Sequence, residues 1–237
     1  MAVYVTSDLH GFSIEEFKRL LASVGFGEDD WLYILGDVID RNNDGGVSIL
    51  LWLLEQPNVQ LIRGNHEQMM LSCAFLFDEI SDETLARLPA NAVESLTRWY
   101  SNGAQPTVAS MKELLLVSPE LVTDILDYLR ETPLCESVEA GGRSFLLCHA
   151  GFGNFSADKK LSDYSENELL WNRPSLEDRY FDGVITVFGH TPTGYLAGRR
   201  GKAVRTETWI DVDVGVSSGT PPMLLRLDDL REIYFDA

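Results

Sequence analysis

The fold is decided by residues 2–11, which read AVYVTSDLHG. Residues 2–6 are mostly apolar or β-branched and predict a buried strand, and Asp8 and His10 follow at its carboxyl end. Helical patterns alternate with further strands of this kind along the chain, which is typical of an α/β fold. Strands with a similar polar loop after them are predicted at 31–35, 59–62, 143–147 and 184–188.

Between about 69 and 133 the strand patterns stop, and the sequence predicts helices. One helix opens at Ser118 and Pro119, with the serine as its cap and the proline in its first position. We take this stretch as a helical insertion or lid within a single domain that spans 1–237, because strand patterns resume after it. The later strands are expected in a hairpin over 137–147 and in three or four β-segments over 203–235.

Composition and charge limit the partners of the chain. Of its 237 residues, 45% are hydrophobic and 24% are charged, as in an ordinary globular protein. An excess of 37 acidic over 19 basic residues gives a net charge of −18, which repels nucleic acid and anionic membranes. Neither a membrane-spanning apolar run nor the basic segment of a secretory signal is visible. We therefore expect a cytoplasmic protein with no nucleic acid and no membrane partner.

The three cysteines also exclude some chemistry. Cys73, Cys135 and Cys148 lie far apart and form no Cys-x-x-Cys pair, so we expect buried, reduced thiols. No cysteine is followed by an arginine at the spacing of a Cys-x5-Arg phosphate cradle, and no Gly-x4-Gly-Lys loop is present. A cysteine-dependent phosphatase and a P-loop enzyme are therefore excluded.

Each of the four histidines lies just past the carboxyl end of a predicted strand. Loops converge at this edge of an open α/β sheet and form a site there. Carboxylates and one amide lie at the same edge. Imidazoles, carboxylates and an amide oxygen, without thiolates, suit a pair of divalent metals in the Mn, Fe or Zn range. The residues concerned are Asp8, His10, Asp37, Asp40, Asn65, His66, His149 and His190.

Five motifs follow one another along the chain: Asp-x-His at 8–10, Gly-Asp-x-x-Asp-Arg at 36–41, Gly-Asn-His-Glu at 64–67, His-Ala-Gly at 149–151 and Gly-His-Thr at 189–191. This order resembles the metal-dependent phosphoprotein phosphatase family within the calcineurin-like metallophosphoesterases, and the short length is similar to its bacterial and phage branch. The resemblance implies an α/β fold with a metallophosphoesterase-type β-sandwich of two mixed sheets flanked by helices. It also implies two divalent metal ions, with Mn favoured and Fe or Zn as alternatives.

The resemblance further implies a division of the ligands between the two metals. Asp37 would bridge them, because a shared carboxylate can hold two cations about 3.5–4 Å apart. A bridging hydroxide would then attack phosphorus directly, so that no phosphoenzyme forms. The ligands of one metal would be Asp8, His10 and Asp37, and those of the other would be Asp37, Asn65, His149 and His190.

Other residues match the catalytic and phosphate-binding positions of the family. His66 would be the general acid that protonates the leaving alkoxide, and Asp40 would pair with its other ring nitrogen and raise the fraction of imidazolium. Arg41 would bind phosphate oxygens through its planar fork, and Asn65 would also contact the substrate. Residues 169–173 match a Leu-Leu-Trp-x-Arg pattern of the family, which makes Arg173 the second phosphate arginine.

The chain departs from the bacterial branch after the Asp-Arg pair, where residues 42–46, Asn-Asn-Asp-Gly-Gly, replace the usual Gly-Pro. We expect a remodelled turn in which Asp44 adds negative charge near the phosphate. For each of two further features, a functional and a structural interpretation remain open. The basic stretch Arg199, Arg200, Lys202 and Arg205 either steers an anionic substrate or forms a solvated hairpin, and Trp99 and Tyr100 either line the cleft or pack a helix.

The motifs predict a hydrolase of the serine/threonine phosphoprotein phosphatase type. It would hydrolyse phosphoserine and phosphothreonine, and also phosphotyrosine, and its partner would be a phosphorylated protein or a small phosphoester. An alternative with the same motifs is a symmetrical dinucleoside-polyphosphate hydrolase, which needs an adenine platform and additional basic contacts. A third alternative is a catalytically silent phosphate-binding module. Such a protein would not need metal-binding residues at every ligand position, and this chain has them. The motifs leave the substrate, the native metal and the oligomeric state open.

Overall fold

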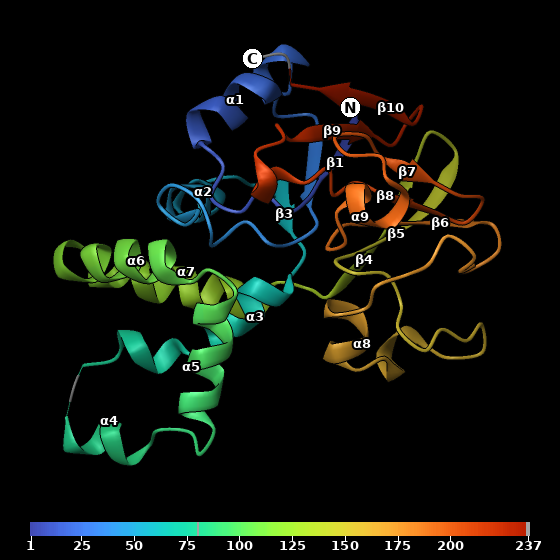
Figure 1. Cartoon of the computed structure of the whole chain (residues 1–237). Coiled ribbons are helices and arrows are strands. Elements are labelled where there is room, and N and C mark those ends of the chain that lie inside the picture. The colour runs from blue at the N-terminus through green and yellow to red at the C-terminus, as the bar shows by residue number, and fades with distance from the viewer. Residues whose placement is uncertain (80, 236–237) are drawn as a thin grey trace.

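The structure, a computed structural model, describes residues 1–79 and 81–235. Two five-stranded sheets pack against each other, and helices cover their outer faces (Figure 1). Each sheet contains both parallel and antiparallel pairs. The prediction of an α/β sandwich of two mixed sheets flanked by helices is confirmed.

The first sheet has the strand order β10-β9-β1-β2-β3. Its three strands from the N-terminal part of the chain are parallel, and β9 pairs antiparallel with β1. Two helices pack on its outer face, and Ser13 caps the first of them by accepting the backbone N–H of Glu16, as its spacing predicts. The elements are β1 Val3–Thr6, α1 Ile14–Ser23, β2 Trp31–Ile34, α2 Val47–Leu53, β3 Val59–Leu61, β9 Met223–Arg226 and β10 Arg231–Tyr234.

The second sheet has the strand order β4-β5-β6-β8-β7. The predicted hairpin joins β4 to β5, and Gly141 and Gly142 both have positive φ, as a tight two-residue turn requires. The predicted β-segments of the tail are four strands, divided between the two sheets. The elements are β4 Cys135–Ala140, β5 Arg143–Cys148, α8 Glu166–Leu170, β6 Val184–Phe188, α9 Thr193–Ala197, β7 Val204–Arg205 and β8 Trp209–Asp211.

A single apolar layer holds the two sheets together. Val5 and Leu35 from the first sheet and its loops share one buried cluster with Phe145, Leu147 and Ile210 from the second sheet. The layer brings the carboxyl ends of strands from both sheets to one edge of the sandwich, where their loops meet. This arrangement places polar residues that are distant in sequence around one cleft.

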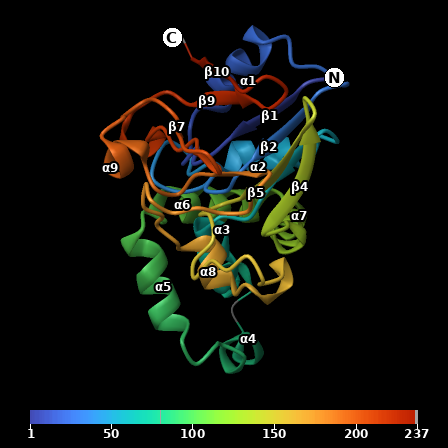
Figure 2. The ribbon, with the colours of Figure 1, turned by 90° about the vertical axis from the view of Figure 1, so that its right-hand side faces the viewer.

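The helical stretch begins at Asn65, four residues before its predicted start, so Asn65 and His66 lie in the first turn of a helix. Pro119 occupies the first turn of α7 as predicted, but the Ser118 side chain makes no cap hydrogen bond. Helices α6 and α7 pack with α2 in the core of the first sheet, whereas α4 and α5 extend away from it (Figures 1 and 2). The helices are α3 Asn65–Ser72, α4 Asp82–Ala86, α5 Ala92–Ser101, α6 Gln105–Val117 and α7 Pro119–Glu131.

The organisation as one domain with a helical insertion stays a prediction, and residues 80, 236 and 237 within it lie outside the described part. None of the described helices is both long and apolar enough to span a membrane. The cysteines are free thiols, and Cys73 and Cys148 are buried as expected, whereas Cys135 is only half-buried. Cys135 and Cys148 lie opposite each other on β4 and β5. Burial raises the pKa of the Cys73 thiol to about 11.

Gly45→Ala should lower the free energy of unfolding more than Gly25→Ala. The two glycines have nearly equal φ values of +67° and +68°, so both substitutions carry a left-handed penalty of about 1–2 kcal/mol. A Cβ at Gly45 would lie 2.2 Å from the backbone nitrogen of Thr107 in α6, whereas nothing lies within 4 Å of one at Gly25. Urea denaturation should show an additional loss of about 1–3 kcal/mol for Gly45→Ala alone. Equal losses would mean that α6 does not constrain this loop.

Candidate active site

The structure brings the sequence-predicted site residues together at the carboxyl edge of the sandwich. They surround a cleft of about 240 Å³ or lie directly against its lining. The loops that follow β1, β2, β3, β5 and β6 each contribute to this site. The predicted residues that line the cleft are Asp8, His10, Asp37, Arg41, Asn65, His66, Arg173 and His190. Asp40 and His149 lie behind them, fully buried.

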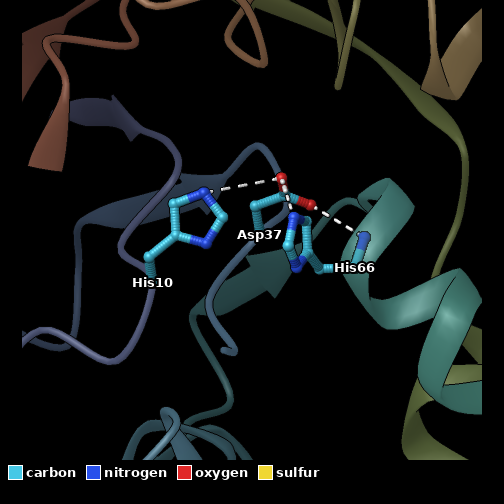
Figure 3. Close-up of side chains that lie close together, drawn as sticks. All are labelled: His10, Asp37 and His66. Atoms are coloured by element: carbon cyan, nitrogen blue, oxygen red, sulfur yellow. Dashed lines mark hydrogen bonds and ion pairs between the residues drawn. The ribbon is translucent and has the colours of Figure 1, made fainter. Parts of the chain in front are cut away.

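The Asp37 carboxylate lies at the centre of this site, and its two oxygens face different histidines. Oδ2 lies 3.7 Å from His10 Nε2 and 3.8 Å from His66 Nε2 (Figure 3). Oδ1 lies 3.5 Å from His149 Nε2 and accepts the backbone N–H of His66 at 3.0 Å. Each oxygen of Asp37 therefore belongs to a different set of candidate ligands, which are His10 with His66 and His149 with His190.

Backbone carbonyl groups orient two of the imidazoles toward the centre. His10 Nδ1 donates to the carbonyl of Ile39 at 3.0 Å, and His149 Nδ1 donates to that of Leu35 at 2.7 Å. In a neutral imidazole the other nitrogen then carries a lone pair, so Nε2 of each ring is an acceptor aimed into the site. This orientation is the usual one for metal-binding histidines.

The second candidate set contains acceptors that face one another. His149 Nε2 lies 2.9 Å from Asn65 Oδ1, although neither atom carries a proton when His149 donates through Nδ1. His190 Nδ1 lies 3.2 Å from the same nitrogen, and His190 Nε2 is buried without a hydrogen-bond partner among the described residues. Acceptors that converge on one point fit a bound cation, so the residues present suit a metal.

The electrostatics of the buried groups point the same way. Burial raises the pKa of Asp37 well above its usual range, and the negative charges of Asp8 and Glu67 raise it further. Burial also lowers the pKa of His10 and of His190, which keeps both imidazoles neutral. Divalent cations would reverse the carboxylate shifts, because they favour the ionised form. These buried carboxylates and neutral imidazoles therefore suit a divalent cation.

The loops of the site are backbone-strained. Nine described residues other than glycine have positive φ, and six of them belong to the predicted site. Such conformations cost about 1–3 kcal/mol each, and they persist where the surroundings over-determine them, often at functional sites. These six residues are Asp8, His10, Asp37, Asp40, Arg41 and His190.

Glu67 holds the central loop in place, and sequence reasoning treated it only as part of a motif. Its buried carboxylate accepts the backbone N–H groups of Asp37 at 2.8 Å, Val38 at 2.9 Å and Gly64 at 2.9 Å. A Cβ at Gly64 would lie 2.3 Å from Asp37 Oδ1, so only glycine fits beside the carboxylate. The Gly-Asn-His-Glu motif therefore positions Asp37 as well as supplying ligands.

Asp40 lies in a buried hydrogen-bond network. Its Oδ2 accepts from His66 Nδ1 at 2.6 Å, as predicted, and from Trp99 Nε1 at 2.8 Å. Its Oδ1 accepts from the Thr107 hydroxyl at 2.5 Å. Burial raises the pKa of Asp40 to about 7, although the bonds from Thr107 and Trp99 oppose this shift. Trp99 thus packs in its helix and also orients the site, while Tyr100 lies outside the cleft.

The second nitrogen of His66 already has a donor. Arg41 Nη2 lies 3.1 Å from His66 Nε2, and a guanidinium can only donate, so Nε2 accepts and the ring proton is on Nδ1. Burial lowers the pKa of His66, and the positive charge of Arg41 lowers it further. The general-acid role of His66 stays a prediction, and it requires Arg41 to leave this nitrogen first.

Asp44 lies in the turn after Arg41 and does not line the cleft. Its carboxylate accepts the backbone N–H groups of Gly46 at 2.9 Å and Ser48 at 2.8 Å, at the start of α2. A helix N-terminus attracts a carboxylate because its first N–H groups lack partners. The expectation that Asp44 adds negative charge near the phosphate is therefore wrong, because the helix start holds that carboxylate.

Arg173 lines the cleft, as its motif predicts, and lies close to an aromatic wall. Trp171 packs edge-on against His190 with 6.0 Å between ring centroids, and the Arg98 guanidinium lies 4.0 Å above the Trp171 ring. Asp213 also lines the cleft, although it was not among the predicted site residues.

The basic stretch 199–205 does not line the metal cleft. Arg205 pairs with Glu232 at 2.7 Å, and the Lys202 amine lies 3.6 Å above the Tyr234 ring. These contacts hold the stretch against the tail of the chain. Arg200 is different, since it lines a separate groove beside the cleft.

The sequence profile of the calcineurin-like phosphoesterases matches residues 1–216. The chain belongs to the calcineurin-like phosphoesterase family. The family resemblance drawn from the five motifs is confirmed at this level, and the chain is a metallophosphoesterase hydrolase. Members of the family use a dinuclear metal centre, and the His and Asp groups around Asp37 supply candidate ligands for it.

Several curated relatives of this phosphoesterase carry the name symmetrical bis(5'-nucleosyl)-tetraphosphatase. The relative from Acidovorax sp. (strain JS42) is 26% identical over 195 residues, which are 81% of this chain and 58% of the relative. That from Haemophilus ducreyi (strain 35000HP / ATCC 700724) is 23% identical over 194 residues, which are 81% of this chain and 59% of the relative. The chain thus spans less than two thirds of the length of either.

Solved structures confirm the fold of the phosphoesterase. A crystal structure of "a putative diadenosine tetraphosphatase" superposes with a TM-score of 0.62 and 16% identity, covering 98% of this chain and 91% of that one. A protein serine/threonine phosphatase from Saccharomyces cerevisiae, with similarity to human phosphatase PP5, gives a TM-score of 0.58 and 15% identity over 100% of this chain and 80% of that one.

The prediction of a serine/threonine phosphoprotein phosphatase is wrong. The curated relatives are named as dinucleoside tetraphosphatases, which is the alternative that the motifs left open. The physical reason is that the five motifs supply metal ligands and phosphate contacts, and both substrate classes present a phosphoryl group to them. The motifs therefore identify the reaction centre but not the group attached to the phosphate.

Glu67→Gln should destabilise the phosphoesterase by about 1–3 kcal/mol. The new amide NH2 group is a donor, so it cannot accept a hydrogen bond from the buried backbone N–H groups that it would face. Either orientation of the amide leaves such a mismatch, since Oε2 serves Asp37 and Gly64 while Oε1 serves Val38. Chemical denaturation and metal analysis should show lower stability and lower metal content.

The matched control is Glu168→Gln. Glu168 accepts the backbone N–H of Ser165 in the same capping position of α8, but near the surface and outside the cleft. The Glu168→Gln protein should lose less stability than the Glu67→Gln protein, and its metal content should equal that of the wild type. A Glu67→Gln protein with full metal content and stability would contradict the positioning role.

Proposed function

We propose that this phosphoesterase cleaves dinucleoside polyphosphates symmetrically. Water adds to one of the two central phosphorus atoms of a dinucleoside tetraphosphate, the bridging P–O bond breaks, and two nucleoside diphosphates result. The names of the curated relatives support this substrate class. The placement of Asp37 between two sets of ligand atoms supports the reaction, since a dinuclear centre is suited to in-line displacement at phosphorus.

The chain supplies ligands for two divalent cations. Asp8, His10 and Asp37 would hold one, and His149 and His190, with Asn65 and Asp37, would hold the other. Such cations polarise phosphoryl oxygens and lower the pKa of water, which makes water a nucleophile near neutral pH. The donor set suits Mn, Fe or Zn better than Mg, because it is rich in imidazole.

Arg41 and Arg173 would bind the polyphosphate. Both line the cleft, and a guanidinium matches phosphate oxygens through two parallel N–H donors. Arg41 currently donates to His66 Nε2 at 3.1 Å. A phosphate oxygen would compete for this donor, because a charged acceptor forms a stronger hydrogen bond than an imidazole nitrogen.

The substrate class changes what is required of His66. A nucleoside diphosphate leaves as a phosphate anion whose conjugate acid has a pKa of about 6, so it departs near neutral pH without a proton. A serine alkoxide cannot do so and needs a general acid. The neutral state of His66, with Nε2 as an acceptor, is therefore compatible with polyphosphate cleavage.

Product analysis tests the proposed function. Protein loaded with Mn²⁺ should convert diadenosine tetraphosphate to ADP alone, and chelation should abolish turnover until Mn²⁺ is restored. Chromatography of the nucleotides gives the answer directly. Formation of ATP with AMP would contradict symmetrical cleavage, and absence of turnover by protein shown to contain metal would contradict the substrate class.

His66→Asn should slow the hydrolysis of diadenosine tetraphosphate and of p-nitrophenyl phosphate by similar factors. Both leaving groups are stable anions near neutral pH, so neither depends on a proton from His66. We expect the two losses in kcat to agree within about threefold, or roughly 0.7 kcal/mol. A loss on the dinucleotide that is larger by about 10²-fold would show that His66 is a general acid for this leaving group.

A further inference from the structure

A second groove adjoins the metal cleft. It has a volume of about 250 Å³ and lies between α9 and the turn at 214–218. Pro192, Tyr195 and Ser218 line both the groove and the metal cleft. A ligand whose phosphates lie in the cleft can therefore extend into the groove.

Tyr195 stands at the junction of the two spaces. It is 83% exposed, more than any other aromatic residue among those described, although it follows the ligand His190 by only five positions. The backbone N–H of Tyr195 donates to the carbonyl of Pro192 at 2.7 Å, so the short helix α9 holds the residue in place. The Tyr195 ring is therefore accessible to a ligand that extends from the cleft into the groove.

Arg200 forms another wall of the groove and is pre-positioned by neutral groups. Its Nη2 donates to the carbonyl of Ser218 at 2.6 Å, and its Nε approaches the Thr220 hydroxyl at 3.4 Å. No carboxylate forms an ion pair with it in residues 1–79 and 81–235. In a chain with a net charge of −18, an arginine without an acidic partner is available to an anionic ligand.

We propose that this groove binds one nucleoside of the substrate, with Tyr195 as the stacking platform for the base and Arg200 close to the phosphate that precedes it. The inference rests on the proposed function for the identity of the polyphosphate. The groove supplies the adenine platform and the basic contact that this substrate class needs and that the five motifs lack. Tyr195 is thus a specificity-determining residue and takes no part in the chemical step.

The shape and charge of the groove indicate which ligand it would bind. A base attached to a polyphosphate combines a flat face, which stacks on tyrosine, with charge that Arg200 and the metal cleft attract. A simple phosphomonoester or inorganic phosphate reaches the metal cleft but leaves the groove empty. The groove should therefore separate nucleotides from small phosphate compounds by affinity.

Calorimetric titration of the Mn²⁺-loaded protein tests this proposal without turnover. The two ligands are α,β-methylene-ADP and methylenediphosphonate, which share a P–C–P group that this reaction cannot cleave and differ in the nucleoside. The wild type should bind the nucleotide at least about tenfold more tightly, as expected for one stacked base. Tyr195→Ala should remove most of this preference and leave methylenediphosphonate binding unchanged, whereas Tyr195→Phe should retain it.

Tyr100→Ala is the matched control, because Tyr100 is a second exposed tyrosine in a helix of the same chain but lies outside both spaces. It should not change either affinity. A wild type that binds both ligands equally, or a Tyr195→Ala protein that keeps the preference, overturns the proposal. The protein could also prefer the nucleotide through Tyr195 and yet fail to cleave diadenosine tetraphosphate. That result would support the nucleoside site in the groove and contradict only the proposed function.

Discussion

The structure depends above all on the placement of one buried carboxylate, that of Asp37. Its oxygens face two different histidine sets, so a shift of about 1 Å would separate it from one of them. Glu67 holds the Asp37 backbone through N–H groups, and Gly64 leaves room beside the side chain. Positive φ at Asp37 and at neighbouring site residues is maintained by this packing, because the strained loops would otherwise relax. The sandwich can be understood as a scaffold that brings these loops to one edge.

The part of this arrangement that depends on local sequence could be predicted. Strand periodicity followed by a histidine or carboxylate located the ligands, because such patterns extend over only a few residues. The contacts that orient the ligands could not be found in this way. Trp99 and Thr107 reach Asp40 across 59 and 67 residues. These contacts are tertiary and leave no periodic signal.

The substrate was predicted wrongly for a related reason. The motifs describe what touches the phosphoryl group, and that group is common to phosphoproteins and dinucleoside polyphosphates. What distinguishes them lies beyond the metals, in the leaving group and in whatever binds it. Tyr195 and Arg200 occupy such positions, but an exposed tyrosine and a basic stretch are common surface features in a sequence. Only their position beside the cleft makes them informative.

The overall charge adds a constraint on how a polyanion can bind. A net charge of −18 repels a tetraphosphate at long range, but the repulsion between exposed charges is screened beyond about 8 Å at physiological ionic strength. Affinity for the proposed substrate would then come from groups in direct reach, which are bound metals, Arg41 and Arg173 in the cleft and Arg200 in the groove. In the proposed reaction each nucleoside diphosphate would make fewer of these contacts than the tetraphosphate, which would favour departure of the products. An acidic surface is therefore compatible with an anionic substrate when the cations are concentrated at the site.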